Sequence, residues 1–296
     1  MRQKNAFGSL ITAMVTPFYR DLRVDYDKVA ELAEHLLKTG SDGLVLAGTT
    51  GESPTLSADE KINICKTALE VVKGRIKIIA GTGGNSTREA IELSKRAEEA
   101  GVDGIMLVTP YYNKPPQEGL YRHFKSIAEA VSLPIMLYNV PGRTAINLAA
   151  ETTLRLAEIE NIVAVKEAGG NLEQITYICA RAPEGFSVYS GDDSLTLPVL
   201  SVGGVGVVSV TSHLIGLEIK KMIETFFAGK VNEAAKIHQK LLPLFNGLFV
   251  VANPIPVKAA LNMIGQEVGE PRLPLCPLTE NLAANLKELL RHYNLL

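Results

Sequence analysis

The sequence has no tryptophan, and it has only three cysteines and five histidines among its 296 residues. The cysteines (Cys65, Cys179 and Cys276) are far apart and form no CxxC pair, which is typical of free thiols in a reducing cytosol. No histidine lies beside a plausible nucleophile or in a metal-ligand spacing such as HExxH. These absences predict a cytoplasmic protein with no disulfide framework, no metal and no cofactor.

Long charged or apolar runs are also missing. The net charge is −2 and no cluster of Lys or Arg stands out, so nothing indicates a nucleic-acid or membrane partner. The most apolar late segment, residues 241–257, is interrupted by two asparagines, a glycine and a proline, too often for a membrane span. Residues 1–15 loosely resemble a signal peptide, but we expect residues 9–15 to be needed as a first strand.

Phosphate-binding motifs are absent as well. Gly81-Thr-Gly-Gly-Asn85 and Gly203-Gly-Val-Gly206 match neither GxxxxGK[ST] nor GxGxxG, and tight turns explain both stretches. At the ends of the predicted strands we identify no pair of Asp/Glu residues that indicates acid–base catalysis by two carboxyl groups. The glycine-rich stretches therefore indicate turns between strands and helices.

Apolar, strand-like runs alternate with helical stretches along the first 228 residues. Strict alternation favours parallel strands with right-handed crossovers, and eight units favour a closed (β/α)₈ TIM barrel of the α/β class. The predicted strands are 9–15, 43–48, 76–80, 105–108, 135–138, 162–166, 186–190 and 205–210. The predicted helices are 26–38, 57–72, one that begins near 86, 117–131, 148–159, 172–180, 193–202 and 213–227.

Local signals support this division into units. Ser57-Ala-Asp-Glu60 and Ser86-Thr-Arg-Glu89 each have the form of a capping box that opens a helix. The phrase Thr39-Gly-Ser-Asp-Gly-Leu-Val-Leu recurs as Ala100-Gly-Val-Asp-Gly-Ile-Met-Leu, 61 residues further on. That offset is two units of a barrel with about 31 residues per unit.

Residues 229–296 follow the eighth unit. They contain three more helical stretches, 231–248, 256–264 and 279–293, with a proline-rich break that begins at Pro271. We expect two parts, a barrel domain of residues 1–228 and a C-terminal helical extension of residues 229–296.

One predicted strand, residues 162–166 of the stretch Ile162-Val-Ala-Val-Lys-Glu167, ends in a lysine. Alternation places Ile162, Ala164 and Lys166 on one face. In apolar surroundings an ammonium group loses hydration, its pKa falls, and the neutral amine can attack a carbonyl carbon. The alternative is that Lys166 marks the strand end and reaches water.

The residues at the carboxyl ends of the strands are the candidates for chemistry in a barrel. An amine forms a Schiff base with a 2-oxo acid, phenols and hydroxyls shuttle protons, and arginine binds a carboxylate through two hydrogen bonds. Each residue alone has a structural explanation, but their common position suggests a 2-oxo acid condensing with a second carboxylate-bearing partner. The candidates are Thr49, Thr50, Tyr111, Tyr112, Tyr138, Arg143, Lys166, Gly191 and Val208.

Four motifs, in order, resemble the dihydrodipicolinate synthase family of the pyruvate-dependent, Schiff-base aldolase superfamily. The resemblance implies condensation of pyruvate with aspartate 4-semialdehyde to 4-hydroxy-tetrahydrodipicolinate, in the diaminopimelate–lysine pathway. It also implies a homotetramer that is a dimer of tight dimers and needs no metal or cofactor. The motifs are Gly48-Thr-Thr-Gly-Glu52-Ser, Thr109-Pro-Tyr-Tyr-Asn113, Tyr138-Asn-Val-Pro-Gly-Arg-Thr144 and Val165-Lys-Glu167.

The resemblance further implies individual roles. Lys166 would form the Schiff base, and Tyr138 would donate and accept protons. Thr49 and Tyr112 would complete a proton relay, with Tyr112 reaching into the site of a neighbouring subunit. Thr50 would hold the carboxylate of pyruvate, with the main chain of Val208 and Gly191 nearby. Arg143 would hold the carboxylate of aspartate semialdehyde.

A further set resembles the allosteric pattern of lysine-inhibited members of the family. Those members often have histidine at the positions of Ala58 and Lys61, and here one residue is apolar and the other is a cation that would repel a lysine ammonium. We therefore expect weak or absent inhibition by lysine. The matching positions are Ser53, Asn85, Glu89 and Tyr111.

Two alternatives remain at this stage. A sister aldolase acting on sialic acid or a 2-keto-3-deoxy sugar acid would share Lys166 and Tyr138, but it would need a hydroxyl-binding pocket where this chain has Pro141-Gly-Arg143. A catalytically silent barrel that only binds a partner would not need the reactive set.

Overall fold

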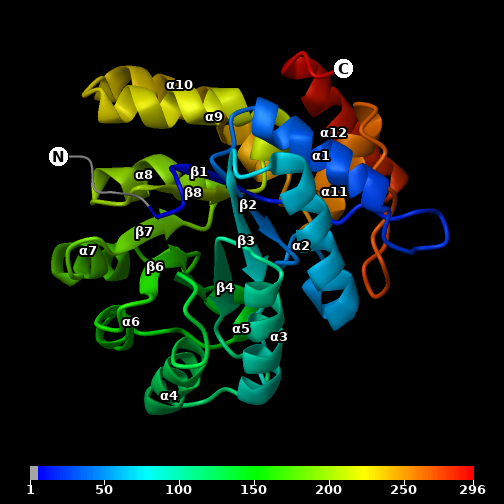
Figure 1. The fold of residues 1–296 in the computed structure, drawn as a ribbon. Coiled ribbons are helices and arrows are strands. Elements are labelled where there is room, and N and C mark those ends of the chain that lie inside the picture. The colour runs from blue at the N-terminus through cyan, green and yellow to red at the C-terminus, as the bar shows by residue number, and fades with distance from the viewer. Residues whose placement is uncertain (1–5) are drawn as a thin grey trace.

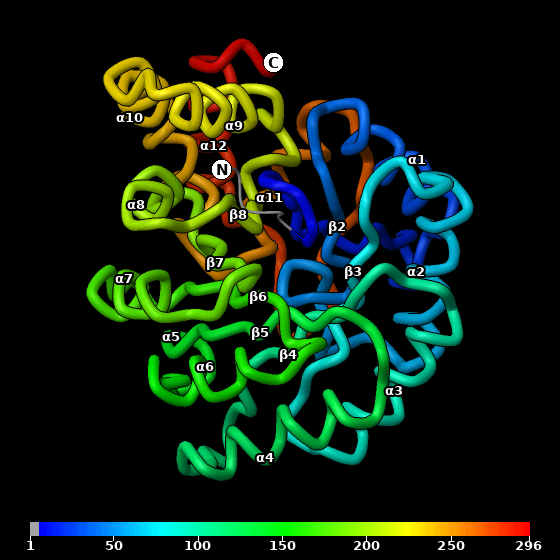
Figure 2. Tube along the Cα trace, turned by 60° about the vertical axis from the view of Figure 1, so that its left-hand side comes forward, coloured from blue at the N-terminus to red at the C-terminus, as the bar shows by residue number. Residues whose placement is uncertain are grey.

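A computed structural model describes residues 6–296, so the first part of the signal-peptide-like stretch lies outside the described residues. Eight parallel strands close into a barrel in sequence order, and helices surround it (Figures 1 and 2). The predicted TIM barrel is confirmed. The strands are β1 (Leu10–Ala13), β2 (Gly43–Leu46), β3 (Lys77–Gly81), β4 (Gly104–Val108), β5 (Ile135–Asn139), β6 (Ile162–Glu167), β7 (Ser187–Ser190) and β8 (Gly206–Ser209).

The helices of the barrel follow their strands as the alternation predicts. They are α1 (Tyr26–Lys38), α2 (Ala58–Val72), α3 (Thr87–Glu99), α4 (Gln117–Ala128), α5 (Pro141–Thr144), α6 (Ala150–Ala157), α7 (Leu172–Arg181), α8 (Thr196–Ser201) and α9 (Ser212–Phe227). Two short 3₁₀ helices, Ser53–Thr55 and Asp193–Leu195, lie in the loops after β2 and β7.

The helices differ from the predictions by one to three residues at several ends, and in three further respects. The capping box of Ser57 is complete, but at Ser86 only the side chain accepts from the Glu89 N–H, so the second box is half formed. The helix predicted over 193–202 is divided into a 3₁₀ turn and α8. The four-residue α5 was not predicted, because one turn is too short to show a helical period.

The apolar side chains form two layers. Both faces of a parallel barrel are covered, so its strands are apolar almost throughout. The residues that point outward pack against the helices, and those that point inward, such as Val45, Ile79, Met106 and Met136, fill the barrel. Tyr138 belongs to the inner layer at the carboxyl end of β5, which brings a phenol into the site.

A β-bulge in β6 corrects the predicted alternation. Ile135 pairs with Ile162, but the next residue, Met136, pairs with Ala164, so Val163 is the extra residue. Ile162 therefore packs in the outer layer, and Ala164 packs in the inner one. The prediction that Ile162 lies on the same face of β6 as Lys166 is wrong. The prediction that Ala164 lies on that face is confirmed.

The C-terminal extension consists of α10 (Val231–Gly247), α11 (Ile255–Met263) and α12 (Glu280–His292). Its apolar residues, including Phe245, Val257 and Leu286, join the same outer core as the barrel helices. In Figure 1 the extension lies beside α9 at one side of the barrel, and both α10 and α11 contact α9. The division at residue 228 stays a prediction, since the two parts share one core.

Within residues 6–296, no helix combines the length and the apolar character that crossing a membrane requires.

Candidate active site

A cavity of about 220 Å³ opens at the carboxyl ends of β2 to β5. Among its lining residues are Thr49 after β2, Met106 and Val108 on β4, Tyr138 on β5, and Arg143 on α5. The lining is therefore mostly apolar, with three hydroxyl side chains, two phenols and one guanidinium. This is the composition expected of a small-molecule site.

Lys166 lies next to this cavity on β6 and is buried, with 5% of its surface exposed. Its Nζ is 4.2 Å from the centroid of the Tyr138 ring. The pKa of Lys166 is lowered to about 7, mainly by burial; the Asp193 charge opposes this shift and the Arg143 charge adds to it. A substantial fraction of this amine is therefore neutral near pH 7. The alternative in which Lys166 reaches water is wrong, because the side chain is buried.

Strand pairing explains why the amine and the phenol are neighbours. Tyr138 is the register partner of Lys166 on the adjacent strand, so the two side chains leave the barrel wall side by side. The backbone carbonyl of Tyr138 accepts hydrogen bonds from the N–H and the hydroxyl of Thr109, both at 2.9 Å, which fixes the strand end. Burial raises the pKa of Tyr138, opposed by the Arg143 charge and by the hydroxyl of Thr49.

The loop after β2 carries Thr49 and Thr50 in a strained conformation. Ala47 and Glu52, on either side of the pair, have left-handed backbones, with φ of 51° and 58°. Thr50 is buried, and its Oγ1 accepts a hydrogen bond of 2.9 Å from the Asn253 side chain. Contacts from elsewhere in the chain therefore hold this loop in place.

Arg143 and Val208 occupy the expected positions. Arg143 is exposed on α5 and lines the cavity, where it can meet an anionic substrate. Val208 is buried in β8 and belongs to the layer inside the barrel.

Gly191 packs against the stem of the candidate nucleophile. A Cβ at this position would lie 3.0 Å from Lys166 Cε and 2.7 Å from Ala168 Cβ. The space that Gly191 leaves is therefore occupied by Lys166.

This contact makes Gly191→Ala a sharp test of how closely the amine is positioned. We expect the added methyl group to displace Lys166 and to lower kcat/KM about 10- to 100-fold, since misplacement of roughly 1 Å can have such an effect. Steady-state kinetics would measure it. Gly84→Ala is the control, because a Cβ there meets nothing within 4 Å; equal losses in the two variants would contradict the explanation.

Tyr112 is not brought to the cavity of its own subunit. It is 89% exposed, it has a left-handed φ of 71°, and it does not line the cavity. Its neighbour Tyr111 does line the cavity. A large aromatic residue held outward in a rare backbone conformation is typical of an interaction site.

All six candidate allosteric residues line a second cavity, of about 380 Å³. Ser53 and Tyr111 line both cavities, so the two are adjacent. Burial lowers the pKa of Lys61. The other members are Ala58, Asn85 and Glu89.

Sequence reasoning missed two side chains near the site, Asp193 and Asn253. Asp193 is buried, its Oδ2 accepts from the Val210 N–H and from both the N–H and the hydroxyl of Thr211, and its charge opposes the fall in the Lys166 pKa. Its place just after Gly191 and β7 was the available signal. Asn253 was noted only as a break in an apolar segment, because its partner Thr50 is 203 residues away.

No group of three or more His, Cys, Asp or Glu side chains within residues 6–296 is arranged to hold a metal ion.

A closed barrel with a small-molecule cavity, and with a buried lysine beside a phenol at the carboxyl ends of its strands, defines a class of protein. It is that of the (β/α)₈ barrel enzymes, whose active sites lie at this rim. Comparison with known proteins gives the particular family.

The chain belongs to the dihydrodipicolinate synthetase family, whose model matches residues 6–293. A 4-hydroxy-tetrahydrodipicolinate synthase of Heliobacterium modesticaldum is 58% identical over 289 residues, which are 98% of this chain and 96% of the relative. The synthase of Bacillus subtilis is 58% identical over 288 residues, 96% of this chain and 99% of the relative.

Solved structures agree with this assignment. The crystal structure of DHDPS from Cyanidioschyzon merolae with lysine bound has a TM-score of 0.98 and 51% identity, and the match covers 99% of this chain and 100% of that one. The family resemblance of the four motifs is thus confirmed over nearly the whole chain.

Proposed function

We propose that this chain is a lyase that condenses pyruvate with aspartate 4-semialdehyde through a Schiff base on Lys166. The product would be 4-hydroxy-tetrahydrodipicolinate, the compound for which its curated relatives are named. The observation that carries the proposal is the Lys166 amine, buried, with a pKa of about 7, and 4.2 Å from the centre of the Tyr138 ring. Such an amine is a nucleophile at neutral pH without help from a stronger base.

The chemistry follows from the protonation states. The neutral Lys166 amine attacks the keto carbon of pyruvate, and the carbinolamine that forms loses water to give the Schiff base. Because burial raises its pKa, Tyr138 keeps its proton at neutral pH and can donate it to the departing hydroxyl. Tyr138, having given up its proton, can then take a methyl proton from the bound pyruvate, which gives an enamine whose carbon attacks the aldehyde of the second substrate. The amino group of that substrate then attacks the imine carbon, which closes the ring and releases the Lys166 amine.

The carboxylates of the two substrates have separate partners in this proposal. The hydroxyl and N–H of Thr50, with the main chain near Val208 and Gly191, would hold the pyruvate carboxylate deep in the site. Arg143, exposed at the mouth, would hold the carboxylate of aspartate semialdehyde. The buried hydroxyl of Thr50 suits pyruvate, which binds first. The exposed guanidinium of Arg143 suits aspartate semialdehyde, which binds over it.

Tyr112 would complete the proton relay with Thr49 and Tyr138 from a neighbouring subunit. Its exposure and left-handed backbone support a role outside its own subunit. We infer a homotetramer built as a dimer of tight dimers, acting in the cytoplasm in diaminopimelate and lysine biosynthesis.

Borohydride reduction in the presence of pyruvate tests the proposal. Mass mapping should place the reduced adduct on Lys166. The trapping rate should rise about ten-fold from pH 6 to pH 8 and then level off, as the neutral fraction of an amine with a pKa of about 7 requires. Lys258 is the internal control because it is equally buried but paired with Glu52; an adduct there, or no adduct, would reject the mechanism.

Feedback by lysine is a separate prediction. The second cavity contains the cationic Lys61 and the apolar Ala58, so a bound lysine ammonium would meet repulsion and no acceptor at these two positions. We expect weak or absent inhibition at 1 mM lysine, an order-of-magnitude limit for a site with one repulsive contact. Initial rates with and without lysine measure this, and strong inhibition at sub-millimolar lysine would show that the cavity binds it.

A further inference from the structure

The C-terminal extension contacts the strained loop that carries Thr49 and Thr50. Asn253, just before α11, is buried, and its Nδ2 is 2.9 Å from Thr50 Oγ1. The two residues are 203 positions apart in the chain. The extension therefore reaches a hydroxyl at the mouth of the barrel.

Two cations of the extension anchor the far end of the same loop. Lys258 Nζ, 1% exposed, donates to Glu52 Oε1 at 2.9 Å and to the carbonyls of Thr16 and Glu270, both at 3.0 Å. The backbone N–H of Arg272 donates to Glu52 Oε2 at 2.8 Å. Both oxygens of a left-handed glutamate in the loop are thus bound by the extension.

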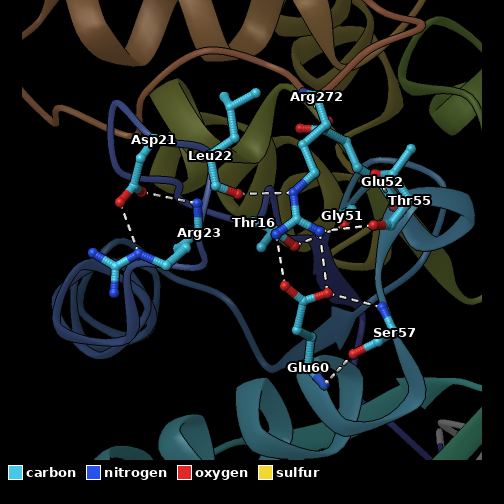
Figure 3. A network of polar contacts seen from close by, with 10 residues as sticks. All are labelled: Thr16, Asp21, Leu22, Arg23, Gly51, Glu52, Thr55, Ser57, Glu60 and Arg272. Atoms are coloured by element: carbon cyan, nitrogen blue, oxygen red, sulfur yellow. Dashed lines mark hydrogen bonds and ion pairs between the residues drawn. The ribbon is translucent and has the colours of Figure 1, made fainter.

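The Arg272 guanidinium extends this anchor to the next helix. It donates to the Thr55 carbonyl at 2.7 Å and to the Leu22 carbonyl at 2.9 Å, and it pairs with both carboxylate oxygens of Glu60 on α2. Figure 3 shows Arg272 between these three segments of the barrel. A left-handed residue other than glycine persists only where its surroundings fix it, and this network does so for Glu52.

The bond to Thr50 has a defined direction. An amide N–H can only donate, so Thr50 Oγ1 acts as the acceptor. A hydroxyl has a single hydrogen, and no second hydrogen bond of Thr50 Oγ1 is found within residues 6–296. The hydrogen of Thr50 therefore stays available for another acceptor.

We propose that Asn253 is a positioning residue that aims the Thr50 hydroxyl hydrogen at the carboxylate of pyruvate. The inference rests on the proposed role of Thr50 and makes the extension part of the substrate site. Removing the amide donor lets the hydroxyl rotate to other acceptors, which weakens binding of the keto acid and leaves the Lys166 amine untouched.

Pyruvate dependence of the reaction tests this role. We expect Asn253→Ala to raise the KM for pyruvate about ten-fold with kcat changed less than about three-fold, the scale of one hydrogen bond to a charged group. The half-saturating pyruvate for borohydride trapping should rise equally. Asn262→Ala is the matched control, because Asn262 is an exposed asparagine of the same extension that bonds only the backbone of Gly269.

Asn253→Asp separates positioning from packing. Aspartate keeps the side-chain size but cannot donate when ionised, and it would take the Thr50 hydrogen and repel the substrate carboxylate. We expect a KM increase of about 100-fold, larger than for alanine. If Asn253 has only a structural role, or if Thr50 donates to Asn253 Oδ1, the KM should increase more in Asn253→Ala than in Asn253→Asp. That result would overturn the proposal.

A double substitution completes the test. In a Thr50→Val background, Asn253→Ala should add less than about two-fold to the KM, because the hydroxyl that it orients is gone. Independent, additive effects would contradict the inference. Failure of the proposed function would instead show as absence of a pyruvate adduct on Lys166 in the unaltered enzyme.

Discussion

Lys166→Met should give a protein that is inactive and more stable than the parent. Methionine fills similar space without an amine, so no Schiff base forms, and we expect kcat/KM to fall at least about 1,000-fold. The gain in stability has an electrostatic origin, because folding transfers this amine from water into an apolar site.

The size and pH dependence of that gain follow from linkage. The pKa of Lys166 falls from 10.5 to about 7 on folding. The unfolded chain therefore binds more protons between pH 7 and pH 10.5, and the stability contribution of this group rises with pH in that window. At pH 7 the penalty amounts to roughly 4 kcal/mol, at about 1.4 kcal/mol per pKa unit.

Urea unfolding at several pH values checks this result. The variant should exceed the parent by about 2–4 kcal/mol at pH 7, and the difference should shrink towards pH 10. Lys230→Met is the control, because the side chain of Lys230 is 61% exposed and carries no such penalty. A variant that loses stability would show that the amine is compensated in the folded state.

The fold was largely predictable because the signals for it are local. A strand between two covered faces is apolar throughout, and a helix shows its period within three turns, as residues 26–38 do. The bulge at Val163 was not predictable, because register depends on the neighbouring strand. Alternation along a strand therefore predicts which side chains share a face only where the pairing with the neighbouring strand has no bulge.

The site was predictable only in part for a similar reason. Thr49, Tyr138 and Lys166 end strands of one barrel, and the carboxyl ends of parallel strands meet at one rim. Asn253 follows no strand and reaches the rim only because the extension folds back over the barrel. Contacts of that kind arise from tertiary packing, which has no periodic signal in the chain.

Glu52→Gln should be among the most destabilising single substitutions in this protein. The Glu52 and Lys258 side chains are each 1% exposed and form an ion pair of 2.9 Å. Glutamine keeps the shape but removes the charge, which leaves the Lys258 ammonium buried without a counterion. Breaking such a pair from one side costs about 3–5 kcal/mol.

Replacing both partners measures the interaction between Glu52 and Lys258 separately from the other contacts of each side chain. In Glu52→Gln/Lys258→Met no buried charge is left uncompensated, so the double variant should lose less stability than the sum of the two single variants, with a coupling energy of about 2 kcal/mol or more in urea unfolding. The exposed pair Lys230–Glu233, with side chains 61% and 63% exposed, is the control. Glu233→Gln should change stability by less than about 0.5 kcal/mol. Additive losses at Glu52 and Lys258 would mean that solvent reaches the pair. Coupled losses would show that this buried ion pair acts together with the Arg272–Glu60 pair as an electrostatic link between the barrel and its C-terminal extension.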